Sequence, residues 1–303
     1  MSSVAILVVT YNRKELLVQN IQAMLQQTCQ DFDYYVMDNA STDGTEEYIK
    51  ELIQSNPHLH YIKLNKNYGG AGGFYYGMKH ILSQDYAYSW IMDDDAIPEA
   101  DALEKILKAA HQIGSDHFSY LASQVLWTDG SPCLMNVCHE VNTKKKNNIA
   151  DENLSQIDYS SFVGCLVNNE VARKIGLPIP EFFIYMDDTE YTLRLSGTRP
   201  AYLVRDSLII HKMQTNSTAG IETAPIEKLP RFRYAYRNRI YCYRYRWHMN
   251  ELKIIILYIL ESLRVLRAHP KHKWKRIKII WNGYREGLNF EPKIRYIEKK
   301  KKG

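Results

Sequence analysis

The residues that first suggest chemistry are three consecutive aspartates, Asp93, Asp94 and Asp95, directly after the short apolar run Tyr88–Met92. Adjacent carboxylates repel one another, and the repulsion grows as they leave water, so a cation is needed to neutralise them. Alternate side chains such as Asp93 and Asp95 can converge on one hard divalent ion, which prefers oxygen ligands. The alternative is a solvated acidic turn before a helix that begins near Pro98.

A second carboxylate group, Asp187, Asp188 and Glu190, follows the apolar segment 182–186 and opens a predicted helix. Helix N-termini stabilise anions, which would keep Asp188 ionised and able to accept a proton. Helix capping is the alternative role for these side chains. Further along, His211 closes a short apolar run, and a lone histidine of this kind is more often structural than a ligand.

Between the first aspartates and the N-terminus lies a glycine-rich segment, Asn65-Lys-Asn-Tyr-Gly-Gly-Ala-Gly-Gly-Phe74, which leads into a predicted helix. Glycines let backbone N–H groups approach a ligand at a helix N-terminus. The spacing matches neither the dinucleotide fingerprint nor the phosphate loop that ends in Gly-Lys-Ser/Thr. We therefore expect contact with a phosphate or sugar here, and a flexible turn is the alternative.

Apolar runs alternate with segments of helical periodicity over the first two thirds of the chain. The predicted strands are Val4–Val9, Asp33–Met37, Leu59–Leu64, Tyr88–Met92, Phe118–Leu126, Phe162–Asn168, Ala201–Val204 and Leu208–Ile210. The predicted helices cover residues 16–25, 45–53 with Thr45 as the cap, 76–81, 100–113, a short stretch from Glu170, and 187–195. This alternation is typical of an α/β fold, Rossmann-like, whose mostly parallel central sheet is flanked by helices.

Two polar segments interrupt this pattern. Residues 129–158 include Lys144-Lys-Lys-Asn-Asn148 and are predicted to form a long mobile insertion or a hairpin. Residues 214–224 are rich in Thr, Asn and Ser and are predicted to form a mobile lid.

Composition limits the class of protein. The chain has 303 residues, of which 45% are hydrophobic and 24% charged, as in globular proteins. Its five cysteines, at positions 29, 133, 138, 165 and 242, form no short paired spacing, which argues against a disulfide framework or a zinc site. The apolar run Val4–Val9 is too short for a signal peptide, so a cytosolic location is expected.

The C-terminal part differs sharply in charge. Residues 228–303 hold 22 Lys and Arg against 5 Asp and Glu, a formal charge of +17, whereas the rest of the chain carries −12. Arginines alternate with tyrosines over 231–246, and the apolar run Leu252–Leu266 is too short and too charged to span a membrane. Cationic amphipathic helices with tryptophan suit an anionic membrane surface. Packing on the body and nucleic-acid binding are the alternatives.

As an ordered set, six motifs resemble the family-2 inverting glycosyltransferases of the GT-A fold. They are Val8-Val-Thr-Tyr-Asn-Arg13, Val36-Met-Asp-Asn-Ala-Ser-Thr-Asp-Gly44, the segment 65–74, Met92-Asp-Asp-Asp-Ala96, Met186-Asp-Asp-Thr-Glu190 and His211. The glycine segment and the triple aspartate look most like galactofuranosyltransferases and rhamnosyltransferases. In both, a segment similar to Tyr236-Arg-Asn238 follows the catalytic domain.

The resemblance implies a role for each matching residue. Asp95 and His211, with Asp93, would ligate Mn²⁺ or Mg²⁺, and Asp188 would be the catalytic base, with Asp187 as the alternative. The nucleotide sugar would be bound by a larger set, namely Thr10, Asn12, Arg13, Asp38, Asn39, Asn67, Gly69, Gly70, Asp93 and Asp94. A GT-A catalytic domain would cover residues 1–225, with its nucleotide-sugar half at about 1–98 and its acceptor half at about 99–225. Residues 226–303 would form a basic helical appendage.

The function that the resemblance implies is metal-dependent, inverting transfer of galactofuranose from UDP-galactofuranose to a lipid-linked cell-surface glycan precursor. Transfer of rhamnose from dTDP-rhamnose is the first alternative, and a catalytically silent membrane or nucleic-acid adaptor is a remote one. We expect a peripheral protein on the inner face of a bacterial plasma membrane, held through residues 228–303 and not bound to nucleic acid. Self-association into a homo-oligomer is left open.

Overall fold

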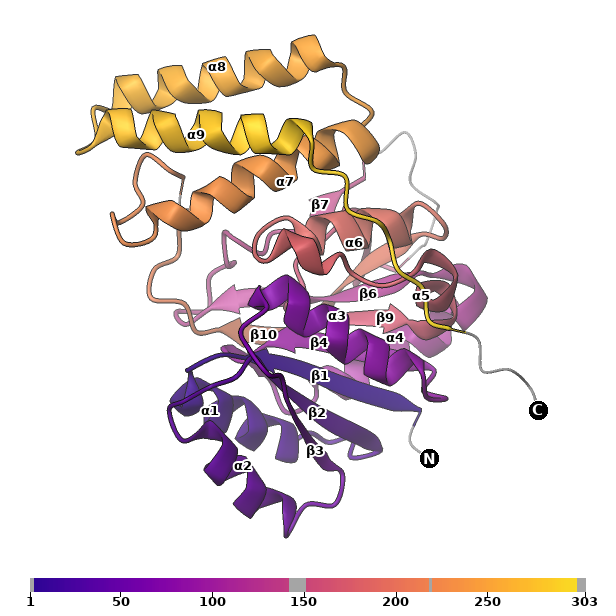
Figure 1. Ribbon diagram of the computed structural model, residues 1–303. Coiled ribbons are helices and arrows are strands. Elements are labelled where there is room, and N and C mark those ends of the chain that lie inside the picture. The colour runs from indigo at the N-terminus through magenta and orange to yellow at the C-terminus, as the bar shows by residue number, and fades with distance from the viewer. Residues whose placement is uncertain (1–2, 142–150, 218–219, 299–303) are drawn as a thin grey trace.

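The computed structural model describes residues 3–141, 151–217 and 220–298 and has the predicted α/β architecture (Figure 1). Its first part alternates β1 (Val4–Thr10), α1 (Lys14–Leu25), β2 (Phe32–Asp38), α2 (Thr45–Ile53), β3 (Leu59–Lys63), α3 (Gly69–Leu82) and β4 (Tyr88–Asp93). The second part contains β5 (Ala96–Pro98), α4 (Ala102–Ile113), β6 (Tyr120–Trp127), β7 (His139–Glu140), β8 (Leu154–Tyr159), β9 (Cys165–Asn168), α5 (Asn169–Ile175), α6 (Asp187–Ser196) and β10 (Ala201–His211). Three helices follow: α7 (Phe232–Tyr245), α8 (Glu251–Ala268) and α9 (Lys273–Leu288).

One central sheet carries the candidate site. Its strand order is β3-β2-β1-β4-β9-β6-β10-β8-β7, and β5 pairs with β10. Strands β1 to β4 are parallel to one another, while β9 runs antiparallel between β4 and β6. Thr10 pairs with Asp38, and Val9 pairs with Asp93. The register therefore brings the carboxyl ends of β1, β2 and β4 to one edge of the sheet, where loops can form a ligand site.

Two apolar layers cover the sheet. Strand β1 is buried along its whole length because alternate side chains point into opposite layers. Val4, Ile6 and Val8 pack with residues of α1, α2 and α4, whereas Ala5 and Leu7 pack with residues of α3, α5 and α6.

Several predicted boundaries were wrong. The two short strands expected at 201–204 and 208–210 are one strand, β10, with an irregularity between Val204 and Leu208. The strand expected from Phe162 begins only at Cys165, because Gly164 has a left-handed φ of 77°. Residues Ala96–Pro98 form β5 against β10, so the helix expected near Pro98 begins at Ala102 instead. The predicted cap Thr45 lies inside α2 and donates to Asp43.

The predicted polar insertion has paired arms. β7 lies antiparallel to β8 at the edge of the sheet, as a hairpin requires. Its middle, including the basic run at 144–148, lies outside the described residues.

The segment that was predicted to be a lid is anchored at its C-terminal end. Ile221 and Ala224 are buried against the C-terminal helices, and their carbonyl oxygens accept hydrogen bonds from Arg276. Residues 218–219 lie outside the described ranges. This end of the segment is therefore part of a packed core, which a freely moving lid would not be.

The glycine-rich segment is helical, so the flexible-turn alternative was wrong. Helix α3 begins at Gly69 itself. A Cβ atom at Gly73 would clash with Cγ1 of Val9 and would lie 2.9 Å from Nδ2 of Asn39, whereas a Cβ at Gly70 would meet no atom within 4 Å. Gly73 thus allows α3 to approach β1 closely, while Gly70 faces open space.

We expect Gly73→Ala to lower the free energy of unfolding by about 1 to 3 kcal/mol, because the added methyl overpacks the contact with β1. The matched variant Gly70→Ala should leave that free energy unchanged or raise it by about 0.4 to 1 kcal/mol, since it only reduces the freedom of the unfolded chain. Urea unfolding followed by circular dichroism measures both. Equal effects of the two substitutions would contradict this account of the packing.

The C-terminal helices form a third layer above α3 and α6 (Figure 1). Tyr241 and Cys242 of α7 share an apolar cluster with Phe182 and Ala71 of the body. After α9 the chain returns to the body, where the backbone N–H of Leu177 donates to the carbonyl oxygen of Arg295 at 2.8 Å. The helical layer therefore packs on the body, as one of the three alternatives proposed. Among the described residues, no helix has the length and apolar character needed to cross a membrane.

Candidate active site

The three aspartates lie where β4 ends and turns into β5. Asp93 is the last residue of β4, and His211, the last residue of β10, pairs with Ala96 of β5. The sheet thereby brings His211 beside the aspartates, with its Nε2 atom 3.0 Å from Oδ1 of Asp95. Asp93, Asp95 and His211 each offer one ligand atom, and these three atoms lie within 4.8 Å of one another. The predicted metal ligands therefore converge.

The aspartates are not a solvated turn, because Asp94 and Asp95 are buried. Burial and the charge of Asp95 raise the pKa of Asp93 to about 7. Burial also raises the pKa of Asp94 to about 6, although the charge of Arg13 opposes this rise. Burial acts upward on Asp95 too, but hydrogen bonds and charges from His211 and Arg13 outweigh it and lower its pKa. The cluster thus holds more negative charge than its surroundings neutralise, which suits a divalent cation.

The orientation of His211 is set by a residue that the sequence reasoning missed. Oδ1 of Asn136 lies 2.8 Å from Nδ1 of His211, and the amide of Asn136 is held the right way round by donating to Oγ of Ser161 at 2.8 Å. Nδ1 of His211 therefore carries the proton, and Nε2 is directed at the aspartates with the geometry of a metal ligand. Asn136 belongs to the polar insertion, where nothing in the sequence distinguishes one asparagine from another.

Two predicted nucleotide-binding residues contact the aspartates directly. Oγ1 of Thr10 donates to Asp94 at 2.7 Å. Nη1 of Arg13 donates to Asp95 at 2.6 Å and to Asp94 at 3.3 Å, while half of the Arg13 side chain stays exposed. Thr10, Arg13 and Asp94 therefore border the candidate metal ligands, and Arg13 supplies positive charge beside them.

Asp38 and Asn12 organise the loops at this edge of the sheet. Asp38 is wholly buried, and its carboxylate accepts hydrogen bonds from the backbone N–H of Ser41 at 2.8 Å and from the hydroxyl of Tyr61 at 2.5 Å. Oδ1 of the exposed Asn12 accepts from the backbone N–H of Thr42 at 2.8 Å. Their predicted contacts with a nucleotide stay predictions.

The remaining predicted nucleotide contacts surround the start of α3. Nδ2 of Asn39 donates to the carbonyl oxygen of Gly69 at 3.0 Å, and Oδ1 of Asn67 accepts from the backbone N–H of Gly69 at 2.7 Å. These bonds fix the first turn of α3, whose N-terminal N–H groups are suited to an anion. The adjacent Gly70 leaves that turn open.

The candidate base lies at the N-terminus of α6. Oδ1 of Asp188 accepts from the backbone N–H of Thr189 at 2.6 Å and from its hydroxyl at 3.2 Å. Burial raises the pKa of both Asp187 and Asp188, and the charges of Asp188 and Asp93 raise that of Asp187 further. The two carboxylate groups are therefore close enough to repel each other. Thr189 stabilises the anion of Asp188, so Asp188 is the member of the pair that ionises more readily.

Glu190, the third member of this group, has a structural role. It is buried and accepts from Arg194 of the same helix at 2.9 and 3.0 Å, and from Arg246 at the end of α7 at 2.6 and 2.9 Å. Both arginines thus compensate a carboxylate that would be costly to bury alone. Glu190 therefore joins α6 to the C-terminal helices.

An unusual backbone precedes α6. Phe183, Tyr185 and Met186 have φ values of 63°, 68° and 68°, in the left-handed region that non-glycine residues avoid. Such a residue costs about 1 to 3 kcal/mol and persists where the surroundings hold it. The carbonyl oxygen of Phe183 accepts from the backbone N–H of Ala71 at 3.2 Å, and a Cβ on Gly69 would clash with that oxygen. The loop 183–186 therefore packs on the first turn of α3.

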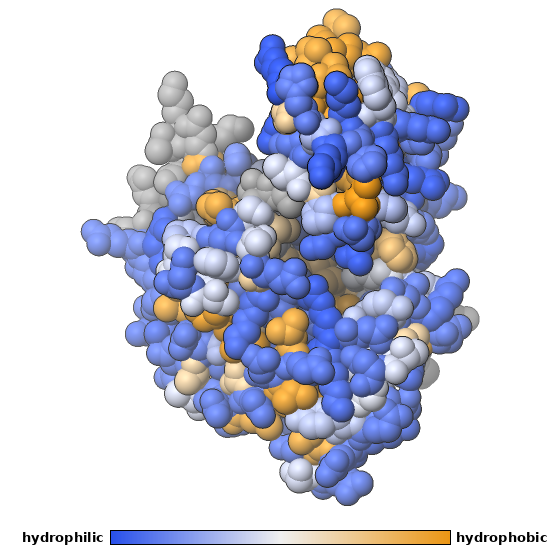
Figure 2. All heavy atoms as spheres, turned by 90° about the vertical axis from the view of Figure 1, so that its left-hand side faces the viewer, coloured by the Kyte–Doolittle hydropathy of each residue, from blue (hydrophilic) through white to orange (hydrophobic). Residues whose placement is uncertain are grey.

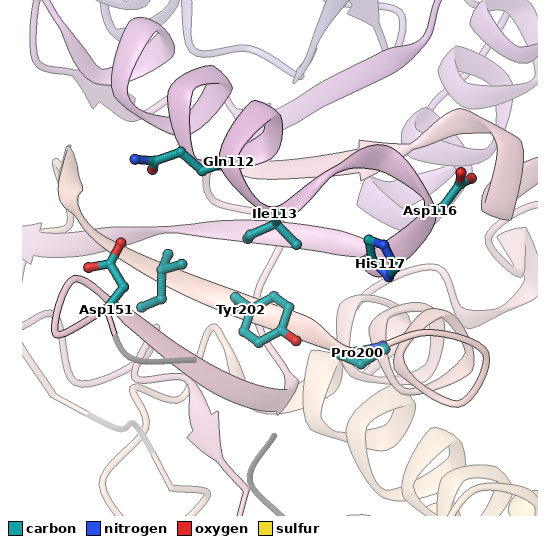
Figure 3. A pocket seen from close by; sticks show the side chains of 8 residues that line it. Gln112, Ile113, Asp116, His117, Asp151, Pro200 and Tyr202 are labelled. Atoms are coloured by element: carbon teal, nitrogen blue, oxygen red, sulfur yellow. The ribbon is translucent and has the colours of Figure 1, made fainter. Parts of the chain in front are cut away.

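A pocket lined by residues of α4, β8 and β10 lies elsewhere (Figure 3). It has a volume of about 600 Å³ and is lined by Gln112, Ile113, Asp116, His117, Asp151, Leu154, Pro200 and Tyr202. Tyr202 and His211 belong to the same strand, and nine residues of extended chain separate them by roughly 30 Å. This pocket is therefore not part of the candidate site.

Sequence comparison finds glycosyltransferases that are similar to this chain. Residues 5–130 match the family described as Glycosyl transferase family 2. Galactofuranosyltransferase GlfT1 of Mycobacterium tuberculosis is 27% identical over 305 residues, which cover 94% of this chain and 96% of that protein. Galactofuranosyltransferase GlfT1 of Mycolicibacterium smegmatis is 27% identical over 63% of this chain, and the match spans 65% of that relative, just under two thirds of its length.

Solved structures share the fold. TarS 1-349 of S. aureus in complex with UDP superposes with a TM-score of 0.55 at 14% identity, covering 99% of this chain and 98% of that one. The mannosyltransferase PcManGT of Pyrobaculum calidifontis, in complex with GDP-Man and Mn²⁺, gives a TM-score of 0.56 at 14% identity, covering 95% of this chain and 87% of that one. The chain therefore has a GT-A fold whose residues 5–130 match a family 2 glycosyltransferase domain, and its sequence relatives support a hexosyltransferase.

Proposed function

We propose that the protein is a metal-dependent, inverting transferase that moves galactofuranose from UDP-galactofuranose to a lipid-linked cell-surface glycan precursor. The observation that carries this proposal is the convergence of Asp93, Asp95 and His211, with Asp187, the neighbour of Asp188, close enough to Asp93 for their charges to interact. Similarity to galactofuranosyltransferases over most of the chain supports the choice of donor.

Asp93, Asp95 and His211 would hold the metal ion, and the imidazole favours Mn²⁺ over Mg²⁺. When bound, the ion supplies Lewis-acid stabilisation to the diphosphate that leaves. Asp188 takes the proton of the acceptor hydroxyl while that oxygen forms its bond to the anomeric carbon. The bond between the anomeric carbon and UDP breaks on the opposite face, so the configuration at that carbon inverts.

The nucleotide part of the donor would lie across the ends of β1 and β2. Asp38 would accept the imide N–H of the base, and Thr10, Asn12 and Arg13 would line its pocket, with Asn39, Asp93 and Asp94 nearby. The backbone of the first turn of α3, held by Asn67 and open at Gly70, would face the diphosphate and the sugar.

Incubation of the purified protein with Mn²⁺, a synthetic lipid-linked acceptor and single nucleotide sugars tests the proposal. Transfer from UDP-galactofuranose is the expected result. Transfer from dTDP-rhamnose in a two-donor competition would favour the rhamnosyltransferase alternative, and no binding of either donor would overturn the proposal. Similarity to glycosyltransferases over most of the chain argues against the silent-adaptor alternative.

We propose that the protein reaches its acceptor at the anionic inner face of a bacterial plasma membrane. Leu252, Ile256, Ile259 and Leu263 of α8 follow helical spacing and are 68%, 44%, 44% and 42% exposed. Figure 2 shows hydrophobic residues gathered at the top of the molecule, where α8 lies. The surrounding segment 228–303 has a formal charge of +17. An exposed apolar stripe within a strongly basic segment is complementary to anionic lipid.

We expect the double substitution Ile256→Glu with Ile259→Glu to weaken binding to phosphatidylglycerol vesicles by about tenfold or more, because it removes exposed apolar area and adds negative charge. Vesicle co-sedimentation at low salt measures this effect. Leu25→Glu, at a 46% exposed site on α1, is the matched control and should bind as the unsubstituted protein does. Unchanged vesicle binding, together with dissociation of an oligomer, would instead assign the stripe to a second copy of the chain.

A further inference from the structure

We infer that Asn238 of α7 is a positioning residue for the transfer reaction: it holds the loop 183–186 so that Asp188 and the first turn of α3 keep their relative placement. This inference rests on the proposed role of Asp188 as the base. It assigns part of the active-site architecture to a helix outside the predicted catalytic domain.

The amide of Asn238 is directed entirely at the segment before α6. The side chain is wholly buried, and its Nδ2 donates to the carbonyl oxygens of Phe182 at 3.0 Å, Ile184 at 3.1 Å and Tyr185 at 2.8 Å. Its Oδ1 accepts from Nε of Arg237 at 3.0 Å, which fixes which way the amide faces. One side chain thus donates to three backbone carbonyl oxygens between residues 182 and 185.

This loop needs such support because of its conformation. Three of its four residues, Phe183, Tyr185 and Met186, are left-handed without being glycine. Residues in that region persist only where surrounding contacts over-determine them, and they cluster at functional sites. Met186 directly precedes Asp187, so any relaxation of the loop moves the start of α6 and its carboxylates.

The same loop also contacts the donor side of the site. The carbonyl oxygen of Phe183 accepts from Ala71 at 3.2 Å and sits against Gly69. By fixing the loop, Asn238 therefore fixes the spacing between the turn proposed to hold the diphosphate and the carboxylate proposed to receive the proton. A side chain that touches neither substrate can in this way govern the alignment of both.

Neighbouring contacts of α7 act in the same direction. Nη2 of Arg237 donates to the carbonyl oxygens of Glu181 at 2.6 Å and Phe182 at 3.2 Å, and its guanidinium lies 3.9 Å from the centre of the Phe290 ring. At the C-terminal end of α7, Arg246 binds Glu190 of α6. Helix α7 therefore contacts both α6 and the segment that precedes the N-terminus of α6.

Asn238→Asp is the decisive substitution. It keeps the size of the side chain and its hydrogen bond from Arg237, but it replaces the donating NH2 group by an oxygen that faces three carbonyl oxygens. We expect kcat to fall by about 100-fold, as a displacement of about 1 Å in the reacting geometry would cause. The KM for the donor and the affinity for UDP with Mn²⁺, measured by calorimetry, should change less than threefold, because the ligands of the nucleotide and metal stay in place.

Asn169→Asp is the matched control. Asn169 is equally buried, and its Nδ2 donates to the carbonyl oxygen of Tyr86 at 3.0 Å, at the opposite end of β4 from Asp93. This variant should lose thermal stability without a change in kcat of the folded protein. If Asn238→Asp does not fold, Arg237→Lys removes the bond that orients the amide and should lower kcat in the same direction.

The outcomes separate the inference from the proposed function. Suppose that the unsubstituted protein transfers sugar. If Asn238→Asp then keeps its kcat, or if Asn238→Asp and Asn169→Asp lose kcat equally, Asn238 is only structural and the inference is overturned. If the unsubstituted protein transfers sugar from no donor, the proposed function fails, and the inference falls with it.

Discussion

Asp95→Asn is expected to lower kcat by at least about 10³-fold and to weaken Mn²⁺ binding by more than about tenfold, since a metal ion supplies several kcal/mol of charge stabilisation in the transition state. Asp95 is the central member of the candidate metal group. One of its oxygens lies 3.0 Å from Nε2 of His211, and the other lies 2.6 Å from Nη1 of Arg13. The neutral amide would leave the imidazole and Asp93 as the only remaining members of the group.

Asp94→Asn provides the control for this experiment. It removes the same charge from the same turn, but Asp94 is not among the three converging ligands and pairs with Thr10 and Arg13 instead. Mn²⁺ titration by calorimetry should show a large loss of affinity for Asp95→Asn and only a small one for Asp94→Asn. Equal losses would mean that the ion responds to the total charge of the turn, and the assigned ligand set would be wrong.

Asp188→Asn is expected to lower kcat by about 10² to 10⁴-fold, the usual contribution of a general base. The affinity for UDP-galactofuranose with Mn²⁺ should stay within threefold, because the donor is proposed to be bound by residues of β1, β2 and α3. Transfer kinetics under saturating donor, with calorimetry for the binding step, measure the two quantities separately. A large loss of donor affinity would contradict the role of Asp188 as a base.

The pH dependence of kcat adds an independent check. Burial raises the pKa of Asp188 above its ordinary value of 3.8, although hydrogen bonds from Thr189 oppose part of this rise. A base acts in its deprotonated form, so kcat should rise with pH through this raised pKa and level off above it. Asp187→Asn should keep the same acidic limb and most of the activity. If Asp187→Asn instead abolishes transfer, the base is Asp187.

The α/β architecture could be predicted from the sequence because the patterns that indicate strands and helices are local and repeat along the chain. Buried parallel strands read as unbroken apolar runs, and the polar residues that end them must meet at one edge of the sheet. That reasoning placed the aspartates at the end of β4, and the register with β1 follows from it. It did not recognise β10 as a single strand, because the exposed Arg205 and Asp206 at its irregularity look like a turn.

The supporting residues of the site could not be predicted in the same way. Asn136 orients His211 from 75 positions away, and Asn238 holds a loop more than 50 positions before it. A single asparagine in a polar segment or a basic helix has no pattern that reveals its partner. Glu190 was grouped with the candidate catalytic carboxylates because the spacing of residues in a sequence does not show which side chains form ion pairs. Its contacts with Arg194 and Arg246 in the folded protein show its role.

The position of Asn238 late in the chain has a consequence for biosynthesis. During translation, the whole α/β body leaves the ribosome before α7 does. The nascent protein therefore contains its proposed metal ligands and proposed base while the loop 183–186 still lacks the amide that supports it. A partly synthesised chain would therefore bind the donor but align it poorly with the proposed base. Competence for sugar transfer would arise only when the C-terminal helices dock.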